Sequence, residues 1–126
     1  MLRACKRLLK REGSIGFFSI FVTVGLSAAD YRRAARSGPP AVRARNLTPS
    51  DLLEAAGFTS IVEQDLTAEF LETGRAWFRE RQQNSEELTA LQGEAIFLER
   101  QADSTAQARA VEEGLLGRGL FIAKRN

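Results

Sequence analysis

Few side chains in this 126-residue sequence have the type and spacing for acid–base or metal chemistry. There is no histidine, which excludes a Ser-His-Asp site and a histidine-based zinc site. The single cysteine, Cys5, has no partner for an internal disulfide or a Cys-x-x-Cys metal site, and it favours a reducing, cytoplasmic compartment. Glu63 and Asp65 would share one face of a strand, as paired carboxylates do, but the sequence identifies no basic partner for them. We therefore predict no catalytic residue and no metal ligand.

Positive charge is concentrated in the first part of the chain. Residues 1–50 contain ten Lys and Arg and two acidic residues, a formal +8, and residues 51–126 carry −6, for a total of +2. Such a segment can contact nucleic acid, an anionic membrane, an acidic partner or the acidic half of its own fold. Nucleic acid is not favoured, because the basic residues lack interleaved aromatics and a base-reading motif. Arg32, Arg33 and Arg36 are candidates for binding an anionic substrate, with a solvated helix face as the alternative.

The length and composition indicate one folded domain. The chain is too short for two ordinary domains. With 44% hydrophobic and 27% charged residues and no low-complexity tract, it is typical of a globular protein.

The first 29 residues have two interpretations. A basic start, an apolar run over residues 15–26 and the small residues that follow have the order of a secretory signal peptide, with cleavage near Ala29. The alternative is a basic amphipathic helix, a turn at Gly13 and a buried strand. The run is rich in Phe, Val, Ile and Thr, which favours the strand, and it is too short to span a bilayer as a helix. Leu2, Cys5, Leu8 and Leu9 would form the apolar face of the preceding helix.

Helix and strand signals then alternate. Ser27 can cap a helix to about Arg36, which Gly38-Pro39-Pro40 ends. Thr48-Pro49-Ser50-Asp51 predicts a capped helix that Gly57 ends, and residues 58–67 are expected to form a strand. The order of strand, helix, helix and strand favours a crossover and a largely parallel sheet.

A long helical stretch is expected from residue 67 to about 116. Its first apolar face would contain Phe70, Leu71, Gly74, Trp77 and Phe78. Residues 84–87 resemble a second capping box, and the apolar pattern continues at Leu88, Leu91, Ala95 and Leu98 and then at Ala106, Ala110, Val111 and Leu115. Residues 119–123, closed by charged residues, predict a last buried strand.

Three segments resemble one family. Residues 8–18 resemble the passage "helix, Leu-Lys-Pro-Gly-Gly, strand" of Rossmann-like S-adenosylmethionine-dependent methyltransferases. Residues 52–62, Leu-Leu-Glu-Ala-Ala-Gly-Phe-Thr-Ser-Ile-Val, are similar to the segment that leads into the sixth strand of that family, and residues 120–125 resemble its seventh, antiparallel strand. The sequence departs from the family at Arg11-Glu12, where the family has Pro-Gly, which leaves the tightness of that turn open.

The resemblance implies an α/β fold consisting of the C-terminal half of such an enzyme. Residues 1–126 would be a single domain with the last three strands of the sheet, the final one antiparallel, and a helical insertion or lid over residues 68–118. The cofactor would be S-adenosylmethionine, but no Gly-rich turn follows a strand in this sequence, so no residue is assigned to cofactor binding.

The resemblance also places the substrate site. Ligands bind beyond the carboxyl ends of strands in open α/β sheets, which makes Phe21, Thr23 and Tyr31 candidates for the wall of a small-molecule substrate pocket. Trp77 and Phe78 would line that pocket under the lid. For all five residues, core packing or surface hydrogen bonding is the alternative.

Three hypotheses remain. The chain is the substrate-side half of a methyltransferase, and a missing N-terminal half or a second chain completes its sheet; or it is a non-catalytic interaction domain of the same origin, which pairs with itself as a homodimer or with another protein. The third is a secreted helical protein made of residues 30–126. In the first two hypotheses the apolar strand over residues 15–22 has an unpaired edge, so we expect the chain to associate with another chain through this edge.

Overall fold

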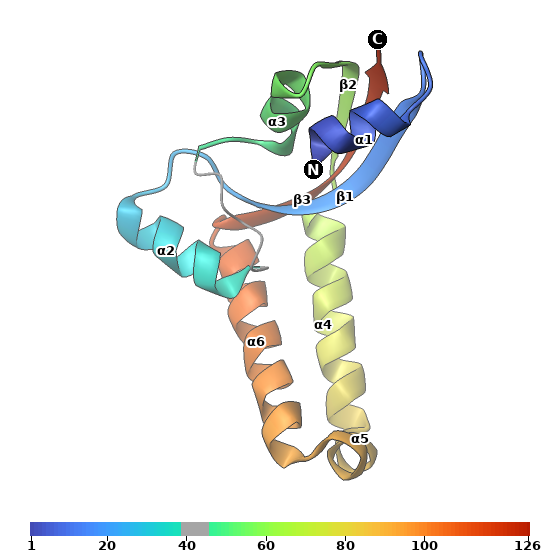
Figure 1. The fold of residues 1–126 in the computed structure, drawn as a ribbon. Helices are drawn as coiled ribbons and strands as arrows, with labels where there is room; N and C mark the ends of the chain where they lie inside the picture. The colour runs from blue at the N-terminus through green and yellow to red at the C-terminus, as the bar shows by residue number, and fades with distance from the viewer. Residues whose placement is uncertain (39–45) are drawn as a thin grey trace.

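The computed structural model describes residues 1–38 and 46–126 and shows an α/β fold, as expected. The element order is α1 (Leu2–Leu8), β1 (Ser14–Val22), α2 (Ala28–Ser37), α3 (Pro49–Ala55), β2 (Phe58–Asp65), α4 (Thr67–Gln83), α5 (Ser85–Gln92), α6 (Glu94–Glu112) and β3 (Leu116–Arg125). Figure 1 shows a twisted sheet that carries α1 and α3, and a long antiparallel pair of helices, α4 and α6, that extends away from the sheet with α5 at its far end. Pro39, Pro40, Arg43 and Arg45 lie outside the described residues.

The strand order is β1-β3-β2, and β3 is antiparallel to both neighbours. Phe18 lies opposite Leu120, and Val62 lies opposite Ile122. The largely parallel sheet that the crossover suggested is wrong, because the end of the chain enters between β1 and β2 and separates them. The antiparallel last strand that the family resemblance implied is confirmed.

The turn between α1 and β1 is tight despite its departure from Pro-Gly. Glu12 adopts a left-handed conformation with φ of 64°, which glycine adopts without strain. The Gly13 N–H donates to the Lys10 carbonyl oxygen at 2.9 Å, and the Glu12 N–H donates to the Arg125 carbonyl oxygen at 3.1 Å. Backbone pairing with the end of β3 therefore holds the turn in place.

One face of the sheet, which we call the closed face, packs against α1 and α3. Its buried cluster consists of Leu53, Phe58, Phe121 and Ala123, with Leu2, Leu9, Ile15, Phe17 and Phe21 packed around it. The Phe17 and Phe121 rings stack with centroids 5.6 Å apart, and Phe21 meets Phe121 edge-on at 6.2 Å. Leu8, predicted for the same face of α1, is 88% exposed because it lies at the last turn of this short helix, past the cluster.

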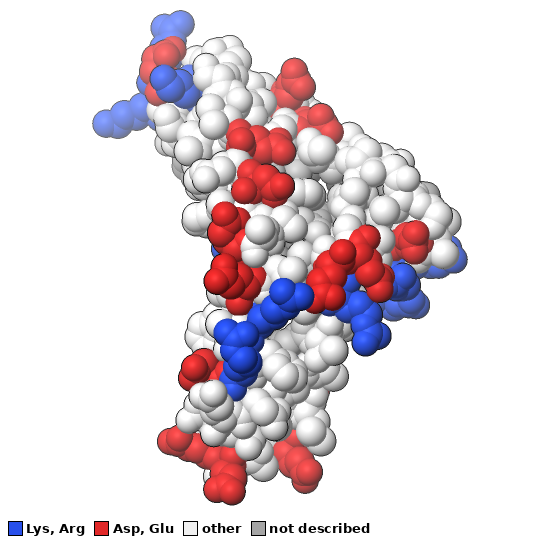
Figure 2. Space-filling view, turned by 180° about the vertical axis from the view of Figure 1, so that it is seen from behind, with Lys and Arg blue, Asp and Glu red and all other residues white. Residues whose placement is uncertain are grey.

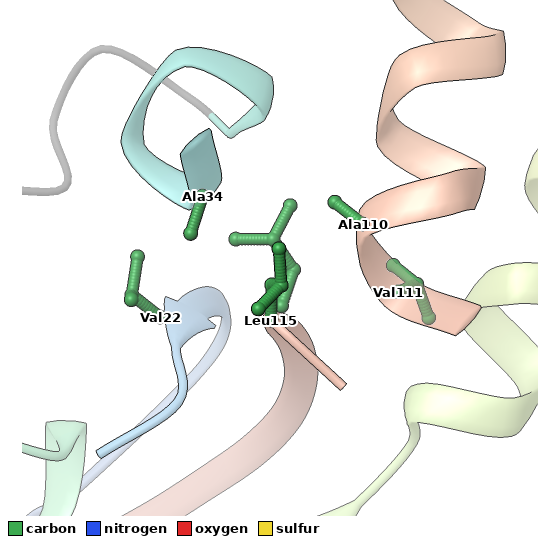
Figure 3. Packing of buried hydrophobic residues seen from close by; sticks show 6 residues of the cluster. Val22, Ala34, Ala110, Val111 and Leu115 are labelled. Atoms are coloured by element: carbon green, nitrogen blue, oxygen red, sulfur yellow. The ribbon is translucent and has the colours of Figure 1, made fainter. Parts of the chain in front are cut away.

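A second cluster joins the helical pair and α2 to the end of the sheet. Figure 3 shows Val22 of β1, Ala34 of α2, and Ala110 and Val111 of α6 converging around Leu115. Tyr31, Phe70 and Leu71 pack against this cluster from the outside. The cluster fixes the position of α6, and through it the position of α4, relative to β1.

The cap predictions have mixed outcomes. Ser27 accepts from the Asp30 N–H, and Thr48 and Asp51 form a reciprocal capping box, as predicted. The second box is wrong, because the Asn84 side-chain amide donates back to the Glu80 carbonyl oxygen at 2.8 Å.

The apolar stripe expected beyond α5 is interrupted. Gly93, with φ of 93°, separates α5 from α6, and Leu91 at the end of α5 is 77% and Leu98 of α6 is 56% exposed. No helix within residues 1–38 and 46–126 has the length and hydropathy needed to cross a membrane.

Gly117→Ala is expected to lower the free energy of unfolding by about 1–3 kcal/mol, because a Cβ at this position on the closed face would overpack the core. It would lie 2.7 Å from Phe21 Cζ and 3.0 Å from Thr67 Oγ1. Urea unfolding followed by circular dichroism measures the change. Gly74→Ala is the matched control: it has open space in the middle of α4 and should stabilise by about 0.5–1 kcal/mol. Equal effects of the two substitutions would contradict this packing.

Glu12→Gly should raise the free energy of unfolding by up to about 1 kcal/mol, because glycine removes the strain of the left-handed conformation. The same unfolding measurement tests it, with Glu54→Gly inside α3 as a control that should destabilise by about 1 kcal/mol. A loss of stability in both variants would argue against a left-handed Glu12.

Candidate functional site

A large cleft follows the free edge of β1. It has a volume of about 800 Å³ and lies between β1, the start of α3 and the inner side of the α4–α6 pair. A second groove of about 570 Å³ continues along the same edge toward α1 and shares Ser19, Pro49 and Leu52 with the first. Within the described residues β1 pairs only with β3, so its other edge opens into this cleft.

Aromatic side chains form much of the cleft wall. Phe18 and Phe21 come from β1, and Phe70 and Trp77 come from α4. Phe70 and Trp77 are seven residues apart on one helix, which places them two turns apart on the same face. The wall is completed by aliphatic residues such as Ile20. The cleft therefore offers a largely apolar surface.

Arg118 of β3 lies between two of these rings. Its guanidinium carbon is 5.0 Å from the Phe18 ring centroid and 5.5 Å from that of Phe70. The backbone N–H of Arg118 donates to Thr67 Oγ1 at 3.2 Å, which ties this part of β3 to the start of α4. Arg118 forms no ion pair with any residue in the described part of the chain.

Arg81 enters the cleft from farther along α4. Its Nε donates to Gln101 Oε1 at 2.7 Å, and its terminal nitrogen donates to Ser104 Oγ. Gln101 is buried, and its amide donates to the Phe78 carbonyl oxygen at 3.2 Å. These hydrogen bonds join α4 to α6 and leave Arg81 among the residues that line the cleft.

Asp65 ends β2 and is held by the first residue of α4. It accepts hydrogen bonds from the Thr67 hydroxyl at 2.6 Å and the Thr67 N–H at 3.0 Å. These two bonds favour the ionised carboxylate and hold the pKa of Asp65 below its ordinary value. Its neighbour Glu63 accepts from the Ser50 hydroxyl at 2.7 Å. Both carboxylates are exposed and make local structural contacts, so the structure does not assemble an acid–base pair from them.

The five predicted pocket residues do not all meet. Phe21 and Trp77 line the cleft. Thr23 lies just beyond β1 and donates from its hydroxyl to the Gly114 carbonyl oxygen at 2.6 Å, and Tyr31 packs against the second hydrophobic cluster. Phe78 lines a separate hollow of about 340 Å³ between α4 and α6. The cleft therefore joins two of the five residues.

The arginines predicted as anion-binding candidates lie on α2, away from the cleft wall. Arg33 forms ion pairs with Glu113 and with Asp30, the latter at 3.7 Å. Arg32 and Arg36 are exposed. Cys5 is a half-buried free thiol on α1, and no group of three or more metal-ligating side chains is found in the described residues.

Sequence reasoning missed Phe18, Arg81 and Arg118. The local sequence pattern predicted the strand or helix that contains each of them, but it did not indicate that the three side chains lie near one another. Arg118 lies beside Phe18 only because β1 and β3 pair in the observed register. In this register Ile20 lies opposite Arg118 and Phe18 lies opposite Leu120, so the paired residues are 98–102 positions apart in the sequence. The available signal was that Arg118 is the one charged residue of β3 before Lys124.

Comparison of the fold with solved structures gives a consistent result. A putative sarcosine dimethylglycine methyltransferase from Galdieria sulphuraria superposes with a TM-score of 0.85 at 11% identity, over 99% of this chain and 46% of that protein. Phosphoethanolamine N-methyltransferase 2 from Haemonchus contortus superposes with a TM-score of 0.81 at 16% identity, over 98% of this chain and 29% of that protein. The cyclopropane synthase MmaA2 from Mycobacterium tuberculosis superposes with a TM-score of 0.80 at 16% identity, over 98% of this chain and 48% of that protein.

The chain has the fold of part of an S-adenosylmethionine-dependent methyltransferase. It spans less than half the length of the three proteins just named. No family model and no curated protein matches the sequence. The resemblance noted in the sequence is thus confirmed at the level of the fold.

Asp65→Asn should reduce the dependence of stability on acid pH. Because the folded-state pKa of Asp65 is below its ordinary value, its contribution is fully present above the unfolded-state pKa and is lost as pH falls through the folded-state pKa. Thermal melts at several pH values below about pH 5 should show a smaller loss of stability for Asp65→Asn than for the unmodified chain. The exposed Asp103→Asn is the control and should keep the original slope; if it flattens the slope as much, the Thr67 contacts are not responsible.

Proposed function

We propose that this chain supplies the sheet edge, substrate wall and helical lid of an S-adenosylmethionine-dependent methyltransferase that acts on a small molecule. In this proposal the cofactor half lies on residues outside the chain. The fold match supports it, because 98–99% of this chain corresponds to 29–48% of each methyltransferase described above. Residues 1–126 then act as one domain, with residues 68–118 as the lid.

The observation that carries the proposal is the unpaired edge of β1. Nine residues, Ser14–Val22, contain no charge and no proline, the usual devices that protect an edge strand. The cleft opens along this edge. A further strand from a missing N-terminal half or from a second chain would complete the sheet and satisfy these backbone groups, and it would occupy the part of the cleft that runs along the edge.

The residues of this chain do not fit the cofactor. The glycine that follows β1, Gly25, donates its N–H to Asn46 Oδ1 at 3.2 Å, and the acidic residue that ends β2, Asp65, is engaged by Thr67. A cofactor site in an open α/β sheet needs a glycine-rich turn with free amides and an available acidic residue. We therefore place the S-adenosylmethionine site elsewhere and derive no catalytic step from this chain.

What these residues contribute is positioning. Methyl transfer from a sulfonium needs the acceptor aligned with the methyl group, and a general base is optional. Phe21 and Trp77 would hold the acceptor in the cleft, while Thr23, Tyr31 and Phe78 lie outside its lining and would act only through the packing of β1, α2 and α4. We infer a cytoplasmic setting from the single free cysteine.

A second candidate function is a non-catalytic interaction domain. It is favoured by the apolar side chains on the sheet face opposite α1 and α3, which we call the open face. Phe18 is 58%, Val62 is 59% and Ile122 is 40% exposed. In this function the chain pairs with a second copy or another protein through β1 and the open face.

Calorimetric titration of S-adenosylmethionine tests the proposed function. The purified 126-residue chain should show no saturable binding, since its own residues lack the cofactor site. The native species isolated from its source, with whatever polypeptide completes the sheet, should bind the cofactor and transfer a radiolabelled methyl group to a small-molecule fraction.

The outcomes separate the two candidates. Binding by the isolated chain would contradict the placement of the cofactor site outside it. A native species that contains the completed sheet but neither binds S-adenosylmethionine nor transfers its methyl group would contradict the methyltransferase function and favour the interaction domain. A native species that is a stable 13.9 kDa monomer with a cooperative melt would contradict both.

A further inference from the structure

We infer that the cleft beside β1 binds an amphiphilic anion, a molecule with an apolar body and a carboxylate-type head, through Arg118. The inference rests on the proposed function in that this ligand is taken as the methyl acceptor. The binding itself needs no cofactor. It can therefore be tested on the chain alone.

The charge of the cleft is one-sided. Among the lining residues that the structure describes, Arg81 and Arg118 are the charged side chains, and none is acidic. Both arginines come from residues 51–126, which carry a formal charge of −6. Figure 2 shows acidic side chains in a line over β2 and the first half of α4, and further groups of them near the end of α6 and at the far end of the helical pair. The lack of carboxylates among the described lining residues is thus a local feature in an acidic part of the chain.

Arg118 is held in a way that suits anion binding. The rings of Phe18 and Phe70 lie 5.0 and 5.5 Å from its guanidinium carbon. Contacts with aromatic rings orient the guanidinium plane and leave its in-plane N–H groups, which match a carboxylate in a bidentate arrangement. Among the described residues this guanidinium has no ion-pair partner, and the hydrogen bond that Arg118 donates to Thr67 comes from its backbone N–H. The side chain is therefore a preorganised donor.

The rest of the cleft suits an apolar body. The same cleft wall contains Ile20 of β1, which lies opposite Arg118 in the sheet, and Trp77 of α4. A volume of about 800 Å³ is in the range of sites for drug-sized ligands, which bind mainly by apolar contact and are oriented by a few polar groups. Arg81, fixed by Gln101 and Ser104, lies in the same lining and adds positive potential.

Trp77 gives a direct readout, because it is the only tryptophan in the chain, lines the cleft and is 63% exposed. Its fluorescence is titrated with decanoate, decyltrimethylammonium and the neutral decyl maltoside, each below its critical micelle concentration. Decanoate should shift the emission to shorter wavelength with saturation. The cationic and neutral probes should bind at least about tenfold more weakly, since they lack the head that Arg118 binds.

Variants then assign the preference to Arg118. Arg118→Gln should weaken decanoate binding about tenfold or more and leave decyl maltoside binding unchanged, and Arg118→Lys should give an intermediate affinity because it keeps the charge without the planar fork. Arg100→Gln removes the same charge from an exposed position of α6 outside the cleft lining and should bind decanoate as the unmodified chain does. Circular dichroism confirms that each variant is folded.

Equal binding of all three probes by the unmodified chain would overturn the inference without the use of any variant. Equal losses in Arg118→Gln and Arg100→Gln would also overturn it, because they would indicate a general charge effect. Selective decanoate binding in a protein whose completed form transfers no methyl group would support the anion site and reject only its role as acceptor site. Methyl transfer by the completed protein without decanoate selectivity would support the proposed methyltransferase function and reject the anion site.

Discussion

The sheet depends on β3, because within the described residues β1 and β2 pair with this strand and not with each other. β3 reaches its place only where glycine leaves room: Gly117 faces Phe21, and Gly119 lies against the Phe121 ring. Its end also holds the beginning of the chain, since the Arg125 N–H donates to the Gly13 carbonyl oxygen at 2.8 Å and the Arg125 guanidinium donates to the Leu9 carbonyl oxygen. The last ten residues thus organise contacts with segments about a hundred residues earlier.

This central position of β3 divides the sheet into unequal surfaces. The closed face buries Phe121 fully between α1 and α3, whereas the open face leaves Phe18 and Ile122 partly in water. In the part of the chain that the structure describes, β1 lies at the outside of the sheet and pairs along one edge only. Arg118 offsets part of this exposure by lying over Phe18 and Phe70, so one side chain both shields aromatic surface and brings a positive charge into the cleft.

Local signals in the sequence predicted most helices and strands, because caps and apolar runs act over a few residues. Ser27 and the Thr48–Asp51 box formed as predicted, and the β1 run is a strand. Asn84 failed because its amide found a nearer acceptor in the preceding helix. Strand order and the cleft required long-range pairing: the crossover alone suggested a parallel sheet, and only the family resemblance supplied the antiparallel β3. Arg118 was missed for the same reason, since its neighbours in space are far away in sequence.

The distribution of charge along the chain is a poor guide to its distribution in the fold. The basic first part meets the acidic second part where Arg33 of α2 pairs with Glu113 beyond α6, which supports one of the alternatives that composition left open. Lys6 instead donates to the Gly57 carbonyl oxygen at 2.8 Å and joins α1 to the start of β2. The arginines that line the cleft, however, belong to the acidic part. Because screening limits exposed charges to about 8–10 Å, a ligand in the cleft responds to Arg81 and Arg118 rather than to the net charge of either half.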